Sequence, residues 1–181
     1  MICETIVVHS KKYIQDASRE ILFKQVGLRE LTNKNDGEHI REYMRAVALP
    51  YGKGYPYCAA GIYYCYFAVN NSTKDVPILR SGSANGIYDY SRKSGEIIKA
   101  PSFLPKVDDL VVWIKKGAYS GHIERIVEVL DDWTVKTIGF NTSSGDKGSQ
   151  RDGGGVFFRI RYLNKPLGSM VVRGLIHFEV E

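Results

Sequence analysis

Apolar residues in the first half of the chain recur at helical spacing. Within residues 38–49 they fall at positions i, i+3, i+4 and i+7, which is the pattern of a helix with one buried face. Residues 14–26 follow a similar spacing, and residues 83–93 begin with a Ser-Ala-Asn sequence that suits a helix start. Residues 55–69 are apolar on nearly all sides. They predict a helix buried in the core, with Pro56 at its first position.

The second half of the chain is typical of β-structure. Runs rich in Val, Ile, Phe and Trp predict five strands, at 110–114, 121–130, 133–140, 156–162 and 169–180. Helices followed by consecutive strands indicate an α+β fold, with N-terminal helices packed on a sequential antiparallel sheet. The sequence shows no internal repeat and no domain boundary. We therefore expect one domain over residues 1–181, in which residues 1–25 form an N-terminal extension helix.

The composition agrees with a globular domain that has its own core. The 181 residues are 44% hydrophobic, 25% charged and 12% aromatic, which excludes a disordered chain. No run approaches the ~20 apolar residues that cross a bilayer, so no transmembrane segment is expected. The N-terminus has no basic region ahead of an apolar run, so no signal peptide is visible.

The charge balance narrows the choice of partner. A net charge of +5 and a pI near 9.0 favour a polyanionic partner such as nucleic acid, acidic lipid or an anionic cell wall. Because the basic residues are scattered along the chain, nucleic acid is not the expected partner. The sequence has no CxxC or HxxxH pair, and its four histidines lie far apart. We therefore expect no metal and no cofactor.

Cys58 is the strongest candidate for a catalytic residue. The predicted helix places this thiol in its first turn, where the helix dipole and the free backbone amides favour a thiolate. The same amides can bind the oxyanion of a tetrahedral intermediate, and Tyr57 is a further candidate for that site. Cys65 lies two turns along the same helix, about 10.5 Å away, which is too far for a disulfide with Cys58.

A cysteine nucleophile needs an imidazole and a polar group that orients the ring. His122 opens the predicted strand 121–130, and Asn141 ends the next strand. A turn around residues 130–132 makes the two strands antiparallel, so we expect Asn141 to lie near His122 and to orient it. Glu124 follows on the same strand face as His122. We expect its side chain to be exposed, and it is a second candidate at the site.

Four short motifs also carry a family resemblance. They are Tyr57-Cys58-Ala59-Ala60, Asp109-Leu110-Val111-Val112-Trp113, Ser120-Gly121-His122-Ile123 and Thr137-Ile138-Gly139-Phe140-Asn141-Thr142. In this order and spacing they resemble the CHAP and NlpC/P60 cysteine amidohydrolases of peptidoglycan, over about residues 26–162. Segments 27–30, 35–37 and 151–156 are similar to a phage-type subgroup. The resemblance implies a papain-like α+β fold, Cys58 as nucleophile, His122 as base and cleavage of peptidoglycan amide bonds.

Two positions depart from the family pattern. The family tends to have small or apolar residues after the histidine, where this chain has Glu124. The family often has an acid two residues before the asparagine, where this chain has Gly139. The usual carboxylate is therefore absent, which leaves Asn141 as the expected orienter and Glu124 as its substitute.

The resemblance predicts a peptidoglycan hydrolase that is either an endopeptidase or an N-acetylmuramoyl-L-alanine amidase. Its expected partner is the stem peptide or the muramic acid of the wall. Because no signal peptide is visible, we expect delivery by phage lysis or by a dedicated secretion system. Two alternatives share the fold: a wall-binding module without activity, and a cysteine protease that acts on proteins. The departures at Glu124 and Gly139 favour the first alternative.

Overall fold

All helices precede all strands in the part of the chain that the structure describes, residues 10–94, 97–99, 104–145 and 153–179 of a computed structural model. The helices are α1 (Lys11–Gln25), α2 (Glu38–Ala46), α3 (Cys58–Phe67) and α4 (Ala84–Lys93). The strands are β1 (Ile97–Lys99), β2 (Leu110–Lys115), β3 (Gly121–Val129), β4 (Thr134–Thr142), β5 (Gly155–Tyr162) and β6 (Met170–His177). The predicted α+β class is confirmed.

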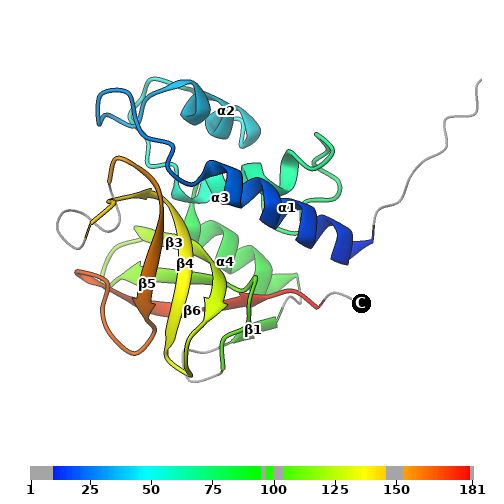
Figure 1. The fold of residues 1–181 in the computed structure, drawn as a ribbon, viewed down its shortest axis with the longest axis vertical. Coiled ribbons are helices and arrows are strands. Elements are labelled where there is room, and N and C mark those ends of the chain that lie inside the picture. Colours follow the sequence, from blue (N-terminus) through cyan, green and yellow to red (C-terminus); the bar gives the residue numbers. More distant parts are fainter. Residues whose placement is uncertain (1–9, 95–96, 100–103, 146–152, 180–181) are drawn as a thin grey trace, which may run out of the picture.

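The strands form one antiparallel sheet in the order β1-β6-β2-β3-β4-β5. The expected sequential order holds from β2 to β5 but is wrong at the other edge, where β6 inserts between β1 and β2. The helices pack into a single core on one face of this sheet, and Figure 1 shows α1, α2 and α3 gathered together. α3 packs directly on β3 and β4, and α1 and α2 pack on α3, whereas α4 contacts β1, β2 and β3.

Side chains alternate between the two faces of a strand, and each face of this sheet is packed in a core of its own. One core lies against the helices and contains Val112 and Ile123. A second core lies on the opposite face and contains Trp113 and Ile126. Even-numbered residues of β3 share the face of Ile126, so polar side chains there enter the second core.

Gly61 allows α3 to approach β4 very closely. A Cβ atom at this position would lie 2.2 Å from Cδ1 of Phe140, which is far inside van der Waals contact. Phe140 and Tyr43 also meet edge to face, with ring centroids 5.2 Å apart. The close packing fixes the start of α3 relative to the strands that it crosses.

Several helix boundaries differ from the predicted ones, and α1 begins at Lys11 instead of residue 14. α2 ends at Ala46, earlier than expected, because Ala48 adopts a left-handed φ of 57°. α3 begins at Cys58, so Pro56 precedes the helix instead of occupying its first position. None of the helices in the described ranges is both long enough and apolar enough to span a bilayer.

Candidate active site

Cys58 is the first residue of α3. Tyr57 occupies the N-cap position and makes no side-chain hydrogen bond there, so the amides of the first turn point toward an open helix end. The predicted position of Cys58 in the first turn is confirmed. Its side chain is 4% exposed, and it borders a cavity of about 270 Å³. The thiol is therefore sheltered from bulk water but accessible from one side.

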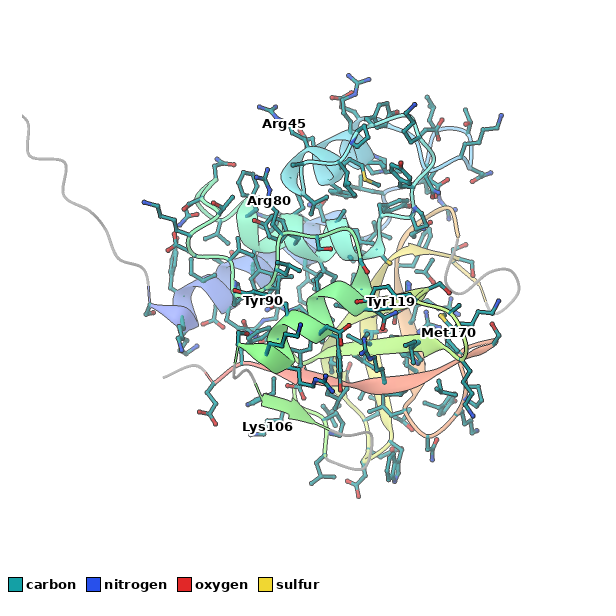
Figure 2. The ribbon with its side chains drawn as sticks, turned by 180° about the vertical axis from the view of Figure 1, so that it is seen from behind. Arg45, Arg80, Tyr90, Lys106, Tyr119 and Met170 are labelled. Atoms are coloured by element: carbon teal, nitrogen blue, oxygen red, sulfur yellow. The ribbon has the colours of Figure 1, made fainter. Side chains whose placement is uncertain are left out.

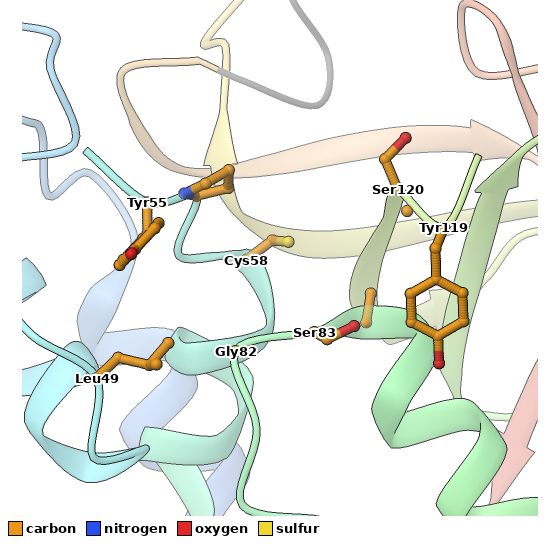
Figure 3. A pocket seen from close by; sticks show the side chains of 10 residues that line it. Leu49, Tyr55, Cys58, Gly82, Ser83, Tyr119 and Ser120 are labelled. Atoms are coloured by element: carbon orange, nitrogen blue, oxygen red, sulfur yellow. The ribbon is translucent and has the colours of Figure 1, made fainter. Parts of the chain in front are cut away.

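The cavity separates two aromatic side chains, with Tyr55 on one side of Cys58 and Tyr119 on the other (Figure 3). Its lining consists of uncharged residues, most of them small or apolar: Leu49, Tyr55, Pro56, Cys58, Gly82, Ser83, Ala84, Tyr119, Ser120 and Gly121. Such a lining suits a short, uncharged part of a substrate.

His122 lies at the beginning of β3, one residue beyond the cavity wall, and is fully buried. Its ring packs against Trp113, with centroids 5.9 Å apart. Nε2 lies 2.8 Å from Oε1 of Glu124. Nδ1 has no hydrogen-bond partner within the described part of the chain. One ring nitrogen is thus held by a carboxylate, and the other is left for the Cys58 thiol.

Glu124 is fully buried, so the expectation of an exposed side chain is wrong. It occupies the same face of β3 as His122 and Ile126, and that face is covered by the second core. Both carboxylate oxygens accept further hydrogen bonds. Oε1 accepts from Nη2 of Arg161 at 2.5 Å, while Oε2 accepts from Nε of Arg161 at 2.8 Å and from Oγ1 of Thr137 at 2.6 Å.

These contacts determine the charge of the site. Burial would raise the pKa of Glu124, but the Arg161 guanidinium and His122 lower it well below its ordinary range. Burial would lower the pKa of His122 from its ordinary 6.5, but the Cys58 thiol and the Glu124 carboxylate outweigh burial and raise it to about 9. At neutral pH the imidazole is therefore protonated and can stabilise a neighbouring thiolate.

Gly139 lies directly opposite Glu124 in the register of β3 and β4. A Cβ atom on Gly139 would lie 2.5 Å from Oε1 and 2.8 Å from Cδ of Glu124. Gly139, where the family often has an acid, therefore faces Glu124, the acid that the family pattern lacks. The Glu124 carboxylate occupies the space that a side chain at residue 139 would need.

Asn141 lies close to the end of β4, where the pairing with β5 shifts between Phe140 and Thr142. It is fully buried and has a left-handed φ of 56°, a conformation that Asn adopts more readily than most residues. Its carbonyl accepts a hydrogen bond from the Gly153 amide. The predicted role of Asn141 as orienter of His122 stays a prediction, since the partner of Nε2 of His122 is the Glu124 carboxylate.

Tyr57 is also fully buried. Its hydroxyl donates to Oε1 of Glu30 at 3.2 Å, and its ring packs near Tyr43. Burial and the Glu30 carboxylate raise the pKa of Tyr57 above its ordinary value. The side chain is not among the residues that line the cavity, and this placement favours packing over the expected oxyanion role.

A polar network on α4 holds the other wall of the cavity. The Tyr119 hydroxyl donates to Oδ2 of Asp89 at 2.7 Å, and Arg173 donates to Oδ1 of Asp89 at 2.6 Å. Asn85 donates to the Tyr119 carbonyl at 3.1 Å and accepts from Arg173 at 2.9 Å. Seen from behind, Tyr119 lies beside α4 (Figure 2). The wall residue Tyr119 is therefore anchored although its ring is largely exposed.

The arrangement agrees with a comparison of the sequence with protein families. A family model for the CHAP domain matches residues 50–141, just over half of the chain. The chain belongs to the CHAP domain family. The CHAP assignment confirms the papain-like α+β fold and implies a hydrolase of the amidase or peptidase type with peptidoglycan as substrate. A search of curated proteins found no match.

The matched region contains Cys58, His122, Glu124 and Asn141 but ends before Arg161. The sequence did not indicate Arg161 as a residue of the site, and it offered Thr137 only as part of the fourth motif. Alternation in β5 places Arg161 on the face of the second core. A charged residue at such a position indicates a buried partner, but the strand pattern alone does not identify that partner.

In the described ranges, no group of three or more His, Cys, Asp or Glu side chains is placed to hold a metal ion.

Proposed function

We propose that this CHAP domain cleaves an amide bond of the peptidoglycan peptide, with Cys58 as nucleophile and His122 as general base and acid. One observation carries the proposal: Cys58 lies at an open helix end beside a cavity, and its thiol interacts with the buried His122 imidazole, whose Nδ1 has no other partner within the described chain. A nucleophile, a base and a group that orients the base are the parts that acyl transfer requires.

The reaction would proceed in two balanced steps. Sγ of Cys58 attacks the carbonyl carbon, and the resulting oxyanion is stabilised by the amides at the start of α3. The C–N bond breaks as the imidazolium of His122 gives its proton to the leaving amine. Water then attacks the thioester carbonyl, and neutral His122 accepts a proton from this water. The C–S bond breaks, the carboxylic acid is released, and the Cys58 thiolate and the His122 imidazolium are restored.

The uncharged cavity supports a particular kind of bond. Among the described residues, no charged side chain lines it, and three of its lining residues, at positions 82, 84 and 121, are glycine or alanine. We infer that the residue next to the cleaved bond is small and uncharged, such as alanine or glycine. Both the bond from muramic acid to L-alanine and an alanine or glycine bond within the peptide meet this condition.

Digestion of purified peptidoglycan, followed by mass spectrometry of the released fragments, tests the proposal. The wild-type protein should release fragments with new amino groups on alanine or glycine. Cys58→Ala and His122→Ala should each abolish release, because a nucleophile and its base act as a unit. Folded variants that still release fragments at the wild-type rate would contradict the mechanism.

Two other outcomes would identify the alternative functions. Sedimentation with peptidoglycan without release of fragments would indicate a wall-binding module. Cleavage of folded proteins in preference to wall fragments would indicate a protease. Both assays use the same preparation, with the Cys58→Ala protein as the matched control.

A further inference from the structure

The buried polar cluster next to His122 contains Glu124, Arg161 and Thr137, and so has more members than a simple ion pair. Glu124 receives two hydrogen bonds from Arg161, one from Thr137 and one contact from Nε2 of His122. Arg161 is 5% exposed, and Glu124 and His122 are not exposed at all. A chain of three charged or chargeable groups therefore runs from β5 through β3 to the catalytic imidazole.

Each bond in this chain restrains the next. The guanidinium of Arg161 binds both oxygens of Glu124, which fixes the plane of the carboxylate. The guanidinium itself lies over the Trp113 ring, 6.0 Å from its centroid, and donates to Oγ1 of Thr142 at 3.3 Å. With its plane fixed, the carboxylate restrains Nε2 of His122, which leaves Nδ1 as the ring nitrogen available to Cys58.

We propose that Glu124 is the positioning residue for His122, that Arg161 holds the Glu124 carboxylate in place, and that Gly139 provides the space for it. This inference rests on the proposed roles of Cys58 and His122. It transfers the orienting role that the sequence suggested for Asn141 to a carboxylate on the strand of the histidine itself.

The facing positions 124 and 139 make the proposal unusually easy to test. The Cβ of a side chain at residue 139 would lie 2.5 Å from Oε1 of Glu124. An aspartate oxygen lies about 2.4 Å from its own Cβ, as follows from the bond lengths of a carboxylate. An aspartate at residue 139 can therefore place an oxygen close to the present position of Oε1, provided that the Glu124 side chain is removed.

Four variants form the central experiment: Glu124→Gln, Glu124→Ala, Gly139→Asp, and Glu124→Ala combined with Gly139→Asp. Glu124→Ala should lower the rate of fragment release about 100-fold, as loss of an orienting partner typically does. Gly139→Asp alone crowds a second acid against Glu124 and should also be harmful. The double variant should regain at least about tenfold over Glu124→Ala, a coupling between facing residues that a merely structural role would not give.

A second readout needs no peptidoglycan, so it distinguishes failure of this inference from failure of the proposed function. Alkylation of Cys58 by iodoacetamide at pH 6 depends on a protonated His122 that stabilises the thiolate. Glu124→Gln keeps the size of the side chain but removes its charge, and should slow alkylation about tenfold. Arg161→Met should slow it in the same direction, and Arg161→Lys should slow it less.

Arg125→Met is the matched control, because Arg125 is equally buried on β3 but binds Asp108 on the other face of the sheet. It should reduce stability without changing the alkylation rate at pH 6. If folded Glu124→Gln protein is alkylated at the wild-type rate, Glu124 is only structural and the proposal fails. A folded double variant no more active than Glu124→Ala would equally overturn the role of Gly139.

Discussion

Two buried arginines lie on opposite faces of the same sheet and serve different purposes. On the helix side, Arg125 binds Asp108 at 2.8 Å and also donates to Oγ of Ser18 and the Gln15 carbonyl. It therefore joins β3 to α1. On the other side, Arg161 binds Glu124, and the chain of contacts continues to His122 beside the cavity.

The difference lies in what the carboxylate holds besides its arginine. Asp108 binds a second arginine, Arg19, so that network ends in a structural ion pair between elements. Glu124 binds the imidazole of His122, so its network ends at a group that can gain or lose a proton, with a pKa raised to about 9. Burial and charge are similar at both places. The two ion pairs therefore differ in the further group that the carboxylate binds, which is an arginine at Asp108 and the His122 imidazole at Glu124.

Replacing each arginine should give the largest difference in stability and turnover between the two networks. Arg161→Met leaves a buried carboxylate without its main cation, which should lower the free energy of unfolding by about 3–5 kcal/mol and turnover by about 10–100-fold. Arg125→Met should destabilise less, since Arg19 still binds Asp108, and turnover should stay near wild type. Chemical denaturation and fragment release, measured where both variants are folded, check the prediction. Equal losses of turnover would contradict it.

The pH dependence of stability and of fragment release should also distinguish the Arg161 network from the Arg125 network. The pKa of His122 is raised to about 9, above its ordinary 6.5, so its charge stabilises the fold fully below about pH 6.5 and this contribution is lost as pH rises through about 9. Fragment release should fall over the same alkaline range, because the leaving amine then receives no proton.

Glu124→Gln should move this alkaline limb to lower pH, since one of the groups that raise the pKa of His122 is removed. Arg125→Met, the matched control, should leave the limb in place. A pH–rate profile of each protein gives the answer. An unchanged limb in Glu124→Gln would show that the carboxylate does not act on the imidazole.

A smaller effect is expected at the cavity wall. Asp89→Asn weakens the contacts that hold Tyr119, and the Arg173–Asp89 pair is partly exposed. We expect KM to rise a few-fold, with a smaller change in kcat, because the wall positions substrate without touching the reacting atoms. Tyr119→Phe, which removes only the hydroxyl, should act in the same direction. A drop in kcat with unchanged KM would place Tyr119 closer to the chemistry than we expect.

The smallest effect concerns Asn141. Because its φ is 56°, Asn141→Ala should be less stable than Asn141→Gly by about 1 kcal/mol. The Gly variant should also lose less turnover than Glu124→Gln, as expected if the backbone of Asn141 matters more than its amide. Thermal unfolding and fragment release of the two variants measure this. A loss in Asn141→Gly as large as in Glu124→Gln would return the orienting role to Asn141.

Local sequence patterns predicted much of this fold. Helical spacing located two helices, an all-round apolar run located the third, and a Ser-Ala-Asn start indicated the fourth. The β-type runs located five of the six strands in the described ranges. β1 was missed because it has only three residues and forms by pairing with β6. The insertion of β6 between β1 and β2 is a tertiary arrangement, and no periodicity along the chain encodes it.

The site was predictable where chemistry follows from position along a single element. The first turn of α3 and the start of β3 located Cys58 and His122 as candidates. The burial of Glu124 was not predictable, because an acid on a strand is usually exposed and its partner Arg161 lies 37 residues later in the chain. Only the sheet register shows that the missing acid at residue 139 and the extra acid at residue 124 face one another.

The contact between Gly139 and Glu124 constrains how such a site can evolve. A lineage that moves the acid from one strand to the other must pass through a protein with two crowded acids or with none, and either intermediate is expected to be impaired. Once the exchange is complete, reversion by a single substitution is equally blocked. Judged by residue 139 alone, a sequence alignment would then indicate that catalytic activity had been lost. The carboxylate is still present, but it reaches the same point in space from β3 instead of β4.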